Sequence, residues 1–164
     1  MAAQLVTVTD TTSDPETLIK GLIQGWQIQF GSLPSKKSIA VLWAQTVIEL
    51  GPTIIMNNNN INGALFDPTA DPNSEYYSSN GLLYLAFDNL ADGSAFYLNF
   101  LMTVQYKNAW SAVLSGNPTQ FATLLATESN YPNEASYTGA LVSVFNDFMR
   151  KTVFETAVTE ITGS

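Results

Sequence analysis

The apolar segment Ile39–Leu50 constrains the fold of this chain more than any other feature. When the segment is placed on a helix, at about 100° per residue, its apolar side chains take up nearly the whole circumference. Ser35 before it is a preferred N-cap residue, and Gly51 with Pro52 after it predicts the end of the helix. A helix that is apolar on almost every side must be surrounded by other elements, so we expect the rest of the chain to pack around it.

The polar residues of this predicted helix fall on one arc. Gln45, Thr46 and Glu49 lie at neighbouring angles, and Glu49 is the one ionisable group between positions 39 and 50. In the last turn of a helix a carboxylate meets the negative end of the helix dipole, and partial burial also disfavours its ionised form. Both effects raise the pKa, as a general acid requires. The alternative, a solvated glutamate on the surface, stays open at this point.

Length and composition indicate one domain. With 164 residues, 46% of them hydrophobic, the chain can bury a core without disulfides or metal ions. We expect an N-terminal arm at residues 1–12, a single domain at 13–150, and a tail or helix extension at 151–164. Only 12% of the residues are charged, which predicts a neutral polar surface of the kind found on assembly components and exported proteins.

The absence of two residue types limits the catalytic and metal-binding chemistry that this chain can carry out. The chain has no cysteine and no histidine. Disulfides, thiol nucleophiles, thiolate or imidazole metal ligands and the usual serine triads are therefore excluded. Carboxylate chemistry is left, and we predict neither a metal site nor a cofactor.

The charge balance argues against polyanionic partners. A net charge of −8 disfavours binding to nucleic acid or to an anionic membrane surface. No lysine or arginine occurs between Lys37 and Lys107, whereas six acids do: Glu49, Asp67, Asp71, Glu75, Asp88 and Asp92. A cleft built from this section would be acidic and would favour the protonated form of an acid within it. Uneven surface charge is the alternative.

The first residues lack the basic and apolar regions of a Sec signal, and no run of about 18 apolar residues is present. We therefore expect no membrane insertion. If the protein leaves the cytoplasm, we expect it to be carried in a virion, or to reach the periplasm or the outside of the cell by a non-Sec route.

The pattern of elements starts with an arm and a helix. Alternation around Leu5, Val6 and Val8 predicts a short strand or a docking arm, and Ser13–Glu16 reads as the capping box of a helix that ends near Gln29. Turn residues and an Asn80–Gly81 hairpin signal then predict a small β-excursion at 66–87. Helical patterns return over 88–104 (with Phe96, Phe100, Leu101 and Val104 inward), over 109–114, from Asn117 and Pro118, and after Pro132.

An asparagine-rich stretch follows the central helix. Four asparagines, Asn57 to Asn60, are flanked by the apolar residues Ile54, Ile55, Ile61 and Leu65. A flexible linker would lack such anchors, so we predict a structured loop.

Several short motifs occur in one order. Ala44 and Gln45 precede Glu49 and Gly51; Asn59, Asn60 and Gly63 follow; then come Ser74, Glu75 and Tyr76; and finally Tyr131 and Tyr137. This order, over about residues 35–150, resembles the endo-β-N-acetylglucosaminidase family of flagellar and autolysin-type peptidoglycan hydrolases, in the lysozyme-like superfamily. The resemblance implies a lysozyme-like helical domain with a small β-excursion.

The same resemblance implies roles for these residues. Glu49 would be the general acid, and Glu75 the second carboxylate unless the N-acetyl group of the substrate supplies the nucleophile. Substrate contacts, directly or through the loop over the acid, are implied for Gln45, Asn59, Asn60, Gly63, Tyr76, Tyr131 and Tyr137. Core packing is the alternative for the two late tyrosines, and a solvated hairpin acid is the alternative for Glu75.

Three departures from the family pattern keep a second class of function open. Leu50 replaces the serine after the acid, Asn62 stands where an aromatic residue is usual, and the second Trp-Gly pair is missing. The first hypothesis is therefore a hydrolase acting on peptidoglycan glycan strands. The second is a catalytically inactive structural or binding component that contacts other proteins of a virion or secretion machine. An unrelated all-α assembly protein is the third.

Overall fold

Seven helices and a small sheet form the part of the chain that the structure describes. The computed structural model describes residues 2–51, 54–128 and 135–163. In this part of the chain the elements are mainly helical, which confirms the predicted mainly α (α+β) class. They are β1 (Gln4–Leu5), α1 (Pro15–Phe30), α2 (Lys36–Leu50), β2 (Glu75–Ser79), β3 (Leu82–Leu85), α3 (Leu90–Leu101), the 3₁₀ turn η1 (Val104–Tyr106), α4 (Lys107–Ser115), α5 (Pro118–Glu128), α6 (Ala135–Arg150) and α7 (Val153–Thr162).

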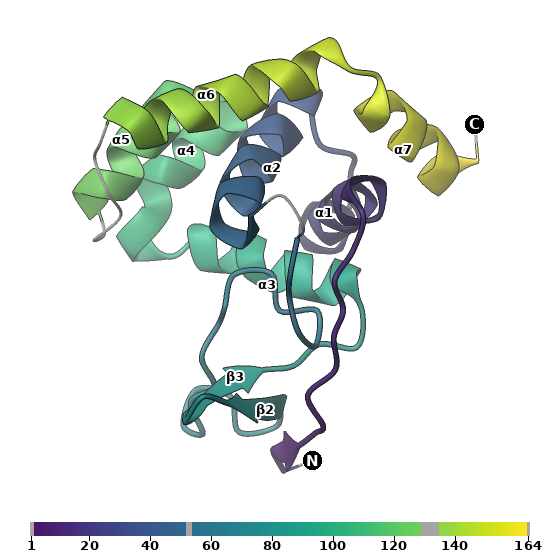
Figure 1. The fold of residues 1–164 in the computed structure, drawn as a ribbon, viewed down its shortest axis with the longest axis vertical. Coiled ribbons are helices and arrows are strands. Elements are labelled where there is room, and N and C mark those ends of the chain that lie inside the picture. The colour runs from purple at the N-terminus through teal and green to yellow at the C-terminus, as the bar shows by residue number, and fades with distance from the viewer. Residues whose placement is uncertain (1, 52–53, 129–134, 164) are drawn as a thin grey trace.

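Helix α2 lies at the centre of the helices, with α6 crossing above it and α3 below it (Figure 1). Its first turn is capped by the Ser35 hydroxyl, which accepts a hydrogen bond from the Ser38 N–H at 3.1 Å. Its last turn closes with the Gly51 N–H donating to Val47 O at 2.8 Å. Residues from Ser38 to Thr46 are buried except Trp43, so the prediction of an almost completely surrounded helix is confirmed.

The core fills the space between α2 and its neighbours. Large apolar side chains from α1, α2, α3, α5 and α6 are closed off from water there. The largest of them in the helices are Phe121, Phe148, Leu18, Ile19, Leu22, Ile23, Ile39, Leu42, Leu98 and Leu101.

Helices α1 and α3 pack closely because α1 presents a glycine to α3. A Cβ atom added to Gly25 would lie 2.5 Å from the Ser94 Cβ and 2.8 Å from the Ala95 nitrogen. A side chain at Gly25 would therefore push the two helices apart. At the start of α3, a Cβ on Gly93 would lie 2.0 Å from the Asn59 carbonyl oxygen, so the asparagine loop rests directly on this helix.

Two predicted details of the helices are wrong. The N-cap of α1 is Asp14, whose carboxylate accepts from the Thr17 N–H at 2.8 Å, and not Ser13, because Pro15 occupies the first helical position. In α3 the buried face carries Tyr97, Leu98 and the predicted Leu101, and the predicted Phe100 packs partly buried against the core, whereas Phe96 contacts Phe87 of the hairpin part instead.

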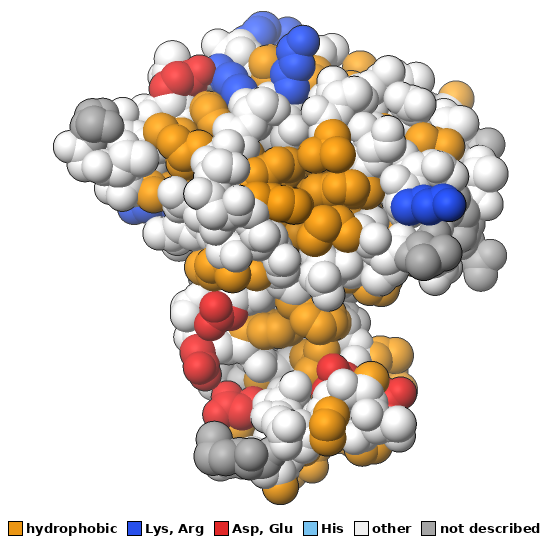
Figure 2. Space-filling model, turned by 180° about the vertical axis from the view of Figure 1, so that it is seen from behind, with side chains coloured by type: hydrophobic (Ala, Val, Ile, Leu, Met, Phe, Trp, Pro, Cys, Tyr) orange, Lys and Arg blue, Asp and Glu red, His pale blue; other side chains and the backbone are white. Residues whose placement is uncertain are grey.

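The sheet and its connections form a smaller part of the molecule, which we call the hairpin part: residues 2–12 and 54–87. Strands β2 and β3 are antiparallel, and Asn80 and Gly81 join them with φ angles of 51° and 79°, as a two-residue hairpin turn requires. β1 pairs with β2 in parallel, so the N-terminal arm docks on the chain's own hairpin. From behind, the molecule narrows between the helices and the hairpin part (Figure 2).

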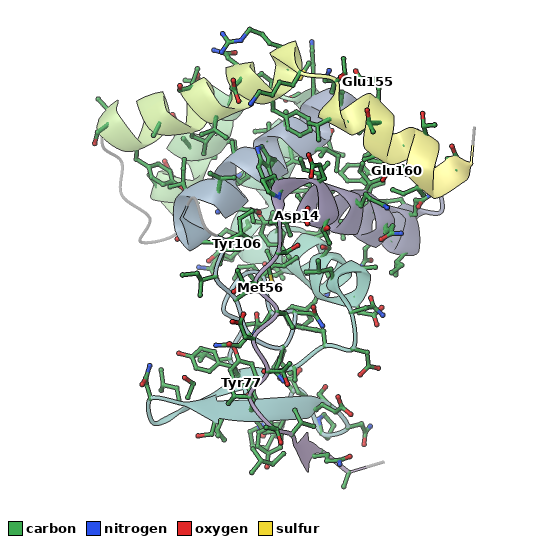
Figure 3. All side chains as sticks on the ribbon, turned by 45° about the vertical axis from the view of Figure 1, so that its right-hand side comes forward. Asp14, Met56, Tyr77, Tyr106, Glu155 and Glu160 are labelled. Carbon is green, nitrogen blue, oxygen red and sulfur yellow. The ribbon has the colours of Figure 1, made fainter. Side chains whose placement is uncertain are left out.

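Helix α7 is held against the other helices by charge as well as by packing. Lys36 contacts Glu155 at 2.7 Å and Lys20 contacts Glu160 at 3.0 Å, and both glutamates project from α7 in Figure 3. Both ion pairs are partly exposed, so each contributes at most about 1 kcal/mol. Within the described ranges, no helix combines the length and hydropathy that crossing a bilayer requires.

Candidate functional site

A cavity of about 210 Å³ lies where the last turns of α2, the loop after the asparagines, and α3 meet. The three polar residues of the α2 arc all line it, and with Gly63 the cavity brings together three of the predicted site residues, Gln45, Glu49 and Gly63. Its lining residues are Gln45, Thr46, Glu49, Leu50, Ile61, Asn62, Gly63 and Tyr97.

Glu49 is the acid of this cavity. The side chain as a whole reaches solvent, but burial around the carboxyl group raises its pKa above the usual glutamate value. Among the residues that the structure describes, no lysine or arginine forms an ion pair with Glu49. A proton on this carboxyl is therefore held more firmly than on an ordinary surface glutamate, and it can still reach a bound ligand.

Gln45 lies one turn before Glu49 and is almost completely buried, with 3% of its surface exposed. The Tyr97 hydroxyl, from α3, donates a hydrogen bond to Gln45 Oε1. Thr46, also buried, donates its hydroxyl proton to the Leu42 carbonyl at 2.8 Å. The part of the cavity wall formed by α2 and α3 is therefore polar, although these two helices bury mostly apolar side chains.

The asparagine side chains hold the loop in place. Asn60 donates to the carbonyls of Ala64 and Leu85 at 3.0 and 2.9 Å and accepts from the Ala64 N–H at 2.9 Å. Asn59 donates to the Phe87 carbonyl at 2.9 Å. Both asparagines, predicted to contact substrate or to fix the loop, use their amides on the backbone and lie outside the cavity lining.

Asn58 joins the same loop to the N-terminal arm. Its amide accepts from the Thr9 N–H and donates to the Thr7 carbonyl, both at 2.9 Å. The stretch is therefore a structured loop, as predicted, and it carries Asn62 and Gly63 to the cavity. Of the four predicted apolar anchors, Ile54 and Ile61 are buried, whereas Ile55 and Leu65 are exposed. Asn62 Oδ1 is closed off from water and accepts no hydrogen bond in the described structure.

The hairpin residues Glu75 and Tyr76 are not brought to this cavity. Both lie on β2, where Glu75 is exposed and Tyr76 stacks on Phe66 with a centroid distance of 4.1 Å. Figure 1 shows β2 in the hairpin part, on the far side of α3 from α2. The two predicted carboxylates therefore occupy different parts of the molecule in this conformation.

Of the two late tyrosines, only Tyr137 can be placed, and it is not among the described residues that line the cavity. Tyr131 lies outside the described residues. Tyr137, on α6, is partly buried and packs against the hydrophobic core.

Sequence analysis missed Tyr97, which contacts Gln45 across 52 positions in the chain. Its one signal was a place on the same helical face as Leu101, four residues on, where an aromatic ring with a polar tip often finds a buried partner.

No cluster of three or more acidic side chains that could hold a metal ion occurs in the described ranges. The described residues that line the cavity offer one carboxyl group, two amides and two hydroxyls as polar groups. Such a set suits proton transfer to a neutral polar ligand. Comparisons of the chain with protein-family models, with curated proteins and with solved structures gave no match.

Proposed function

We propose that the chain is a glycoside hydrolase that cleaves the β-1,4 glycan backbone of peptidoglycan, with Glu49 as general acid. The observation that carries the proposal is the setting of Glu49: a carboxyl group with a raised pKa and no ion-pair partner among the described residues, at the edge of a cavity. A raised pKa favours the protonated form of the carboxyl group, which is the form that donates a proton to a leaving oxygen.

The reaction needs this proton at one bond. Glu49 donates it to the glycosidic oxygen while the bond from that oxygen to C1 of the N-acetylglucosamine unit breaks. Positive charge develops on the sugar ring and must be met by a nucleophile on the other side. Water finally adds at C1 and returns a proton to the Glu49 carboxylate.

The nucleophile proposed here is the acetamido oxygen of the substrate. Glu49 is the one carboxyl group among the described residues that line the cavity, and Glu75 lies in the hairpin part. When the acetamido oxygen bonds to C1, a second protein carboxylate is not needed as the nucleophile. This route suits a site whose described lining residues include one acid, Glu49.

The second candidate is a catalytically inactive binding or structural component of a virion or secretion assembly. The small cavity favours it, because about 210 Å³ is below the roughly 300–1,000 Å³ of most ligand sites. The low share of charged residues, 12%, also suits an assembly. Carriage in such an assembly is compatible with either function.

Zymography on purified peptidoglycan separates the two candidates. The wild-type chain should clear the substrate, and Glu49→Gln should lose at least about 100-fold in rate, the usual contribution of a general acid. Glu16→Gln, an exposed change on α1, is the matched control and should clear normally. Glu75→Gln should retain most activity if the acetamido group is the nucleophile.

Equal clearing by the wild type and Glu49→Gln would refute the catalytic role. No clearing by the wild type, under conditions where the chain is folded, would favour the inactive component.

A further inference from the structure

The hydrogen bond between Tyr97 and Gln45 links α3 to α2 in the wall of the cavity. Both side chains are nearly closed off from water, with exposed fractions of 4% and 3%. Both also line the cavity that contains Glu49. Burying the polar groups of two side chains lowers the stability of the fold unless both groups form hydrogen bonds.

In this bond the Gln45 amide presents its oxygen, Oε1, to Tyr97. The Tyr97 hydroxyl occupies Oε1, so the polar group that Gln45 has left is its NH₂, with two donors. In the described structure Nε2 makes no hydrogen bond, and it is not among the polar atoms that are closed off from water. The NH₂ group therefore remains available to the cavity.

We propose that Tyr97 is a positioning residue that holds the Gln45 amide with its NH₂ group toward the ligand, beside Glu49. The inference rests on the proposed function, because it assigns the neighbouring polar contact of the same site. Without the hydroxyl, the amide can turn and present its oxygen instead, which reverses the hydrogen-bonding character of this wall.

The chemistry of the ligand follows from the donors that face it. The NH₂ of Gln45 donates, and Glu49 also donates in the protonated form that a general acid requires, so the ligand must supply an oxygen acceptor at this point. In a neutral glycan that acceptor is either an acetamido carbonyl or a ring hydroxyl. A positively charged amino sugar would place a third donor there and be disfavoured.

A double-mutant cycle tests the coupling. Calorimetric titration with the trimer of N-acetylglucosamine would compare the wild type, Gln45→Met, Tyr97→Phe and the double variant. If Tyr97 acts through Gln45, Gln45→Met weakens binding about tenfold and Tyr97→Phe about fivefold, while the double variant stays near tenfold instead of reaching the product of about fiftyfold. Cellotriose, which has hydroxyls but no acetamido groups, is the second probe.

Losses confined to the acetylated trimer assign the acceptor to the carbonyl, and losses with both trimers assign it to a hydroxyl. Multiplied losses in the double variant, unchanged binding by Tyr97→Phe, or no binding of either trimer to the wild type at millimolar concentration would overturn the inference. Tyr106→Phe, a buried tyrosine outside the cavity, is the matched control and should bind normally.

Stability must be followed in parallel. Tyr97→Phe alone leaves a buried amide oxygen unpaired, whereas the double variant replaces both polar groups by apolar groups of similar shape. Thermal unfolding therefore identifies any variant that fails to fold, and the comparison of Gln45→Met with the double variant still tests the coupling. Peptidoglycan clearing is measured separately: coupled binding without clearing would refute the hydrolase and leave this inference standing.

Discussion

In the helical part of the molecule, which comprises α1 to α7, the buried groups are mostly apolar. In the hairpin part, asparagine amides are buried together with apolar side chains. Phe121 and Phe148 fill the space between helices without any polar partner to satisfy. Asn58 and Asn60, which are almost as buried, each make more than one hydrogen bond to the backbone. The difference shows that packing gives α2 its position, while directional bonds give the loop its shape.

The cavity lies where these two kinds of structure meet. Gln45 and Glu49 come from the apolar side, and Asn62 and Gly63 come from the loop. Packing of α2 holds Glu49 in a fixed position, whereas the position of the loop that faces it depends on individual hydrogen bonds. The two parts should therefore respond differently to substitution.

The largest effect is expected in the helical core. Phe121→Ala removes a fully buried ring and should lower the free energy of unfolding by about 3–5 kcal/mol, through lost burial and a residual cavity. Urea denaturation measures this change. Phe66→Ala, a partly buried ring in the hairpin part, is the matched comparison and should cost clearly less. Equal losses would remove the distinction between the two parts.

A smaller effect is expected from the loop. Asn60→Leu keeps the approximate shape of the side chain but leaves the Ala64 N–H and the Ala64 and Leu85 carbonyls without this partner. Because an unpaired buried polar group costs about 1–3 kcal/mol, we expect a total loss of about 2–4 kcal/mol in the same denaturation experiment.

Asn62→Leu, two residues on, is the control for this change. Its Oδ1 atom already lacks a partner, so its removal should leave stability unchanged or raise it by up to about 1 kcal/mol. If Asn60→Leu proved as harmless as Asn62→Leu, the amides would not be what holds the loop.

The smallest effect concerns pH. The pKa of Glu49 is raised by desolvation in the folded chain, so the folded state binds this proton more tightly than the unfolded state does. The contribution of Glu49 to the free energy of unfolding is therefore lost as the pH rises from the usual glutamate pKa through the raised pKa. Because the side chain is exposed, solvent screening keeps the change small.

Thermal unfolding of the wild type and Glu49→Gln at two pH values measures it. At about pH 4 the carboxyl is largely protonated in both the folded and the unfolded state, so the stability difference between variant and wild type at this pH is the reference. At about pH 7 this difference should shift slightly in favour of the variant. A difference that does not vary with pH would contradict the raised pKa.

Much of the helical part could be predicted from the sequence because its signals are local. The apolar circumference of Ile39–Leu50, the Ser35 cap and Gly51 predicted α2, and Asn117 with Pro118 predicted the start of α5. The hairpin turn at Asn80 and Gly81 was equally clear, because both positions need a positive φ. The cap of α1 was misplaced by one residue, since Ser13 and Asp14 are both good capping residues.

The candidate site was less predictable because its contacts join distant positions. Gln45 and Glu49 share an arc of one helix, and that local relation predicted their common environment. Tyr97 joins Gln45 from another helix, and its place on the buried face of α3 was not predicted. The pairing of β1 with β2 likewise depends on the tertiary fold, which no local pattern records.

The attachment of the N-terminal arm has a mechanical consequence. Its bonds to β2 and to the Asn58 amide lie between the start of the chain and every helix. A force applied at the N-terminus therefore acts first on these hydrogen bonds, and they can break before the force reaches the helices. Traction on that end would deform the loop beside Glu49 while leaving the packed interior intact.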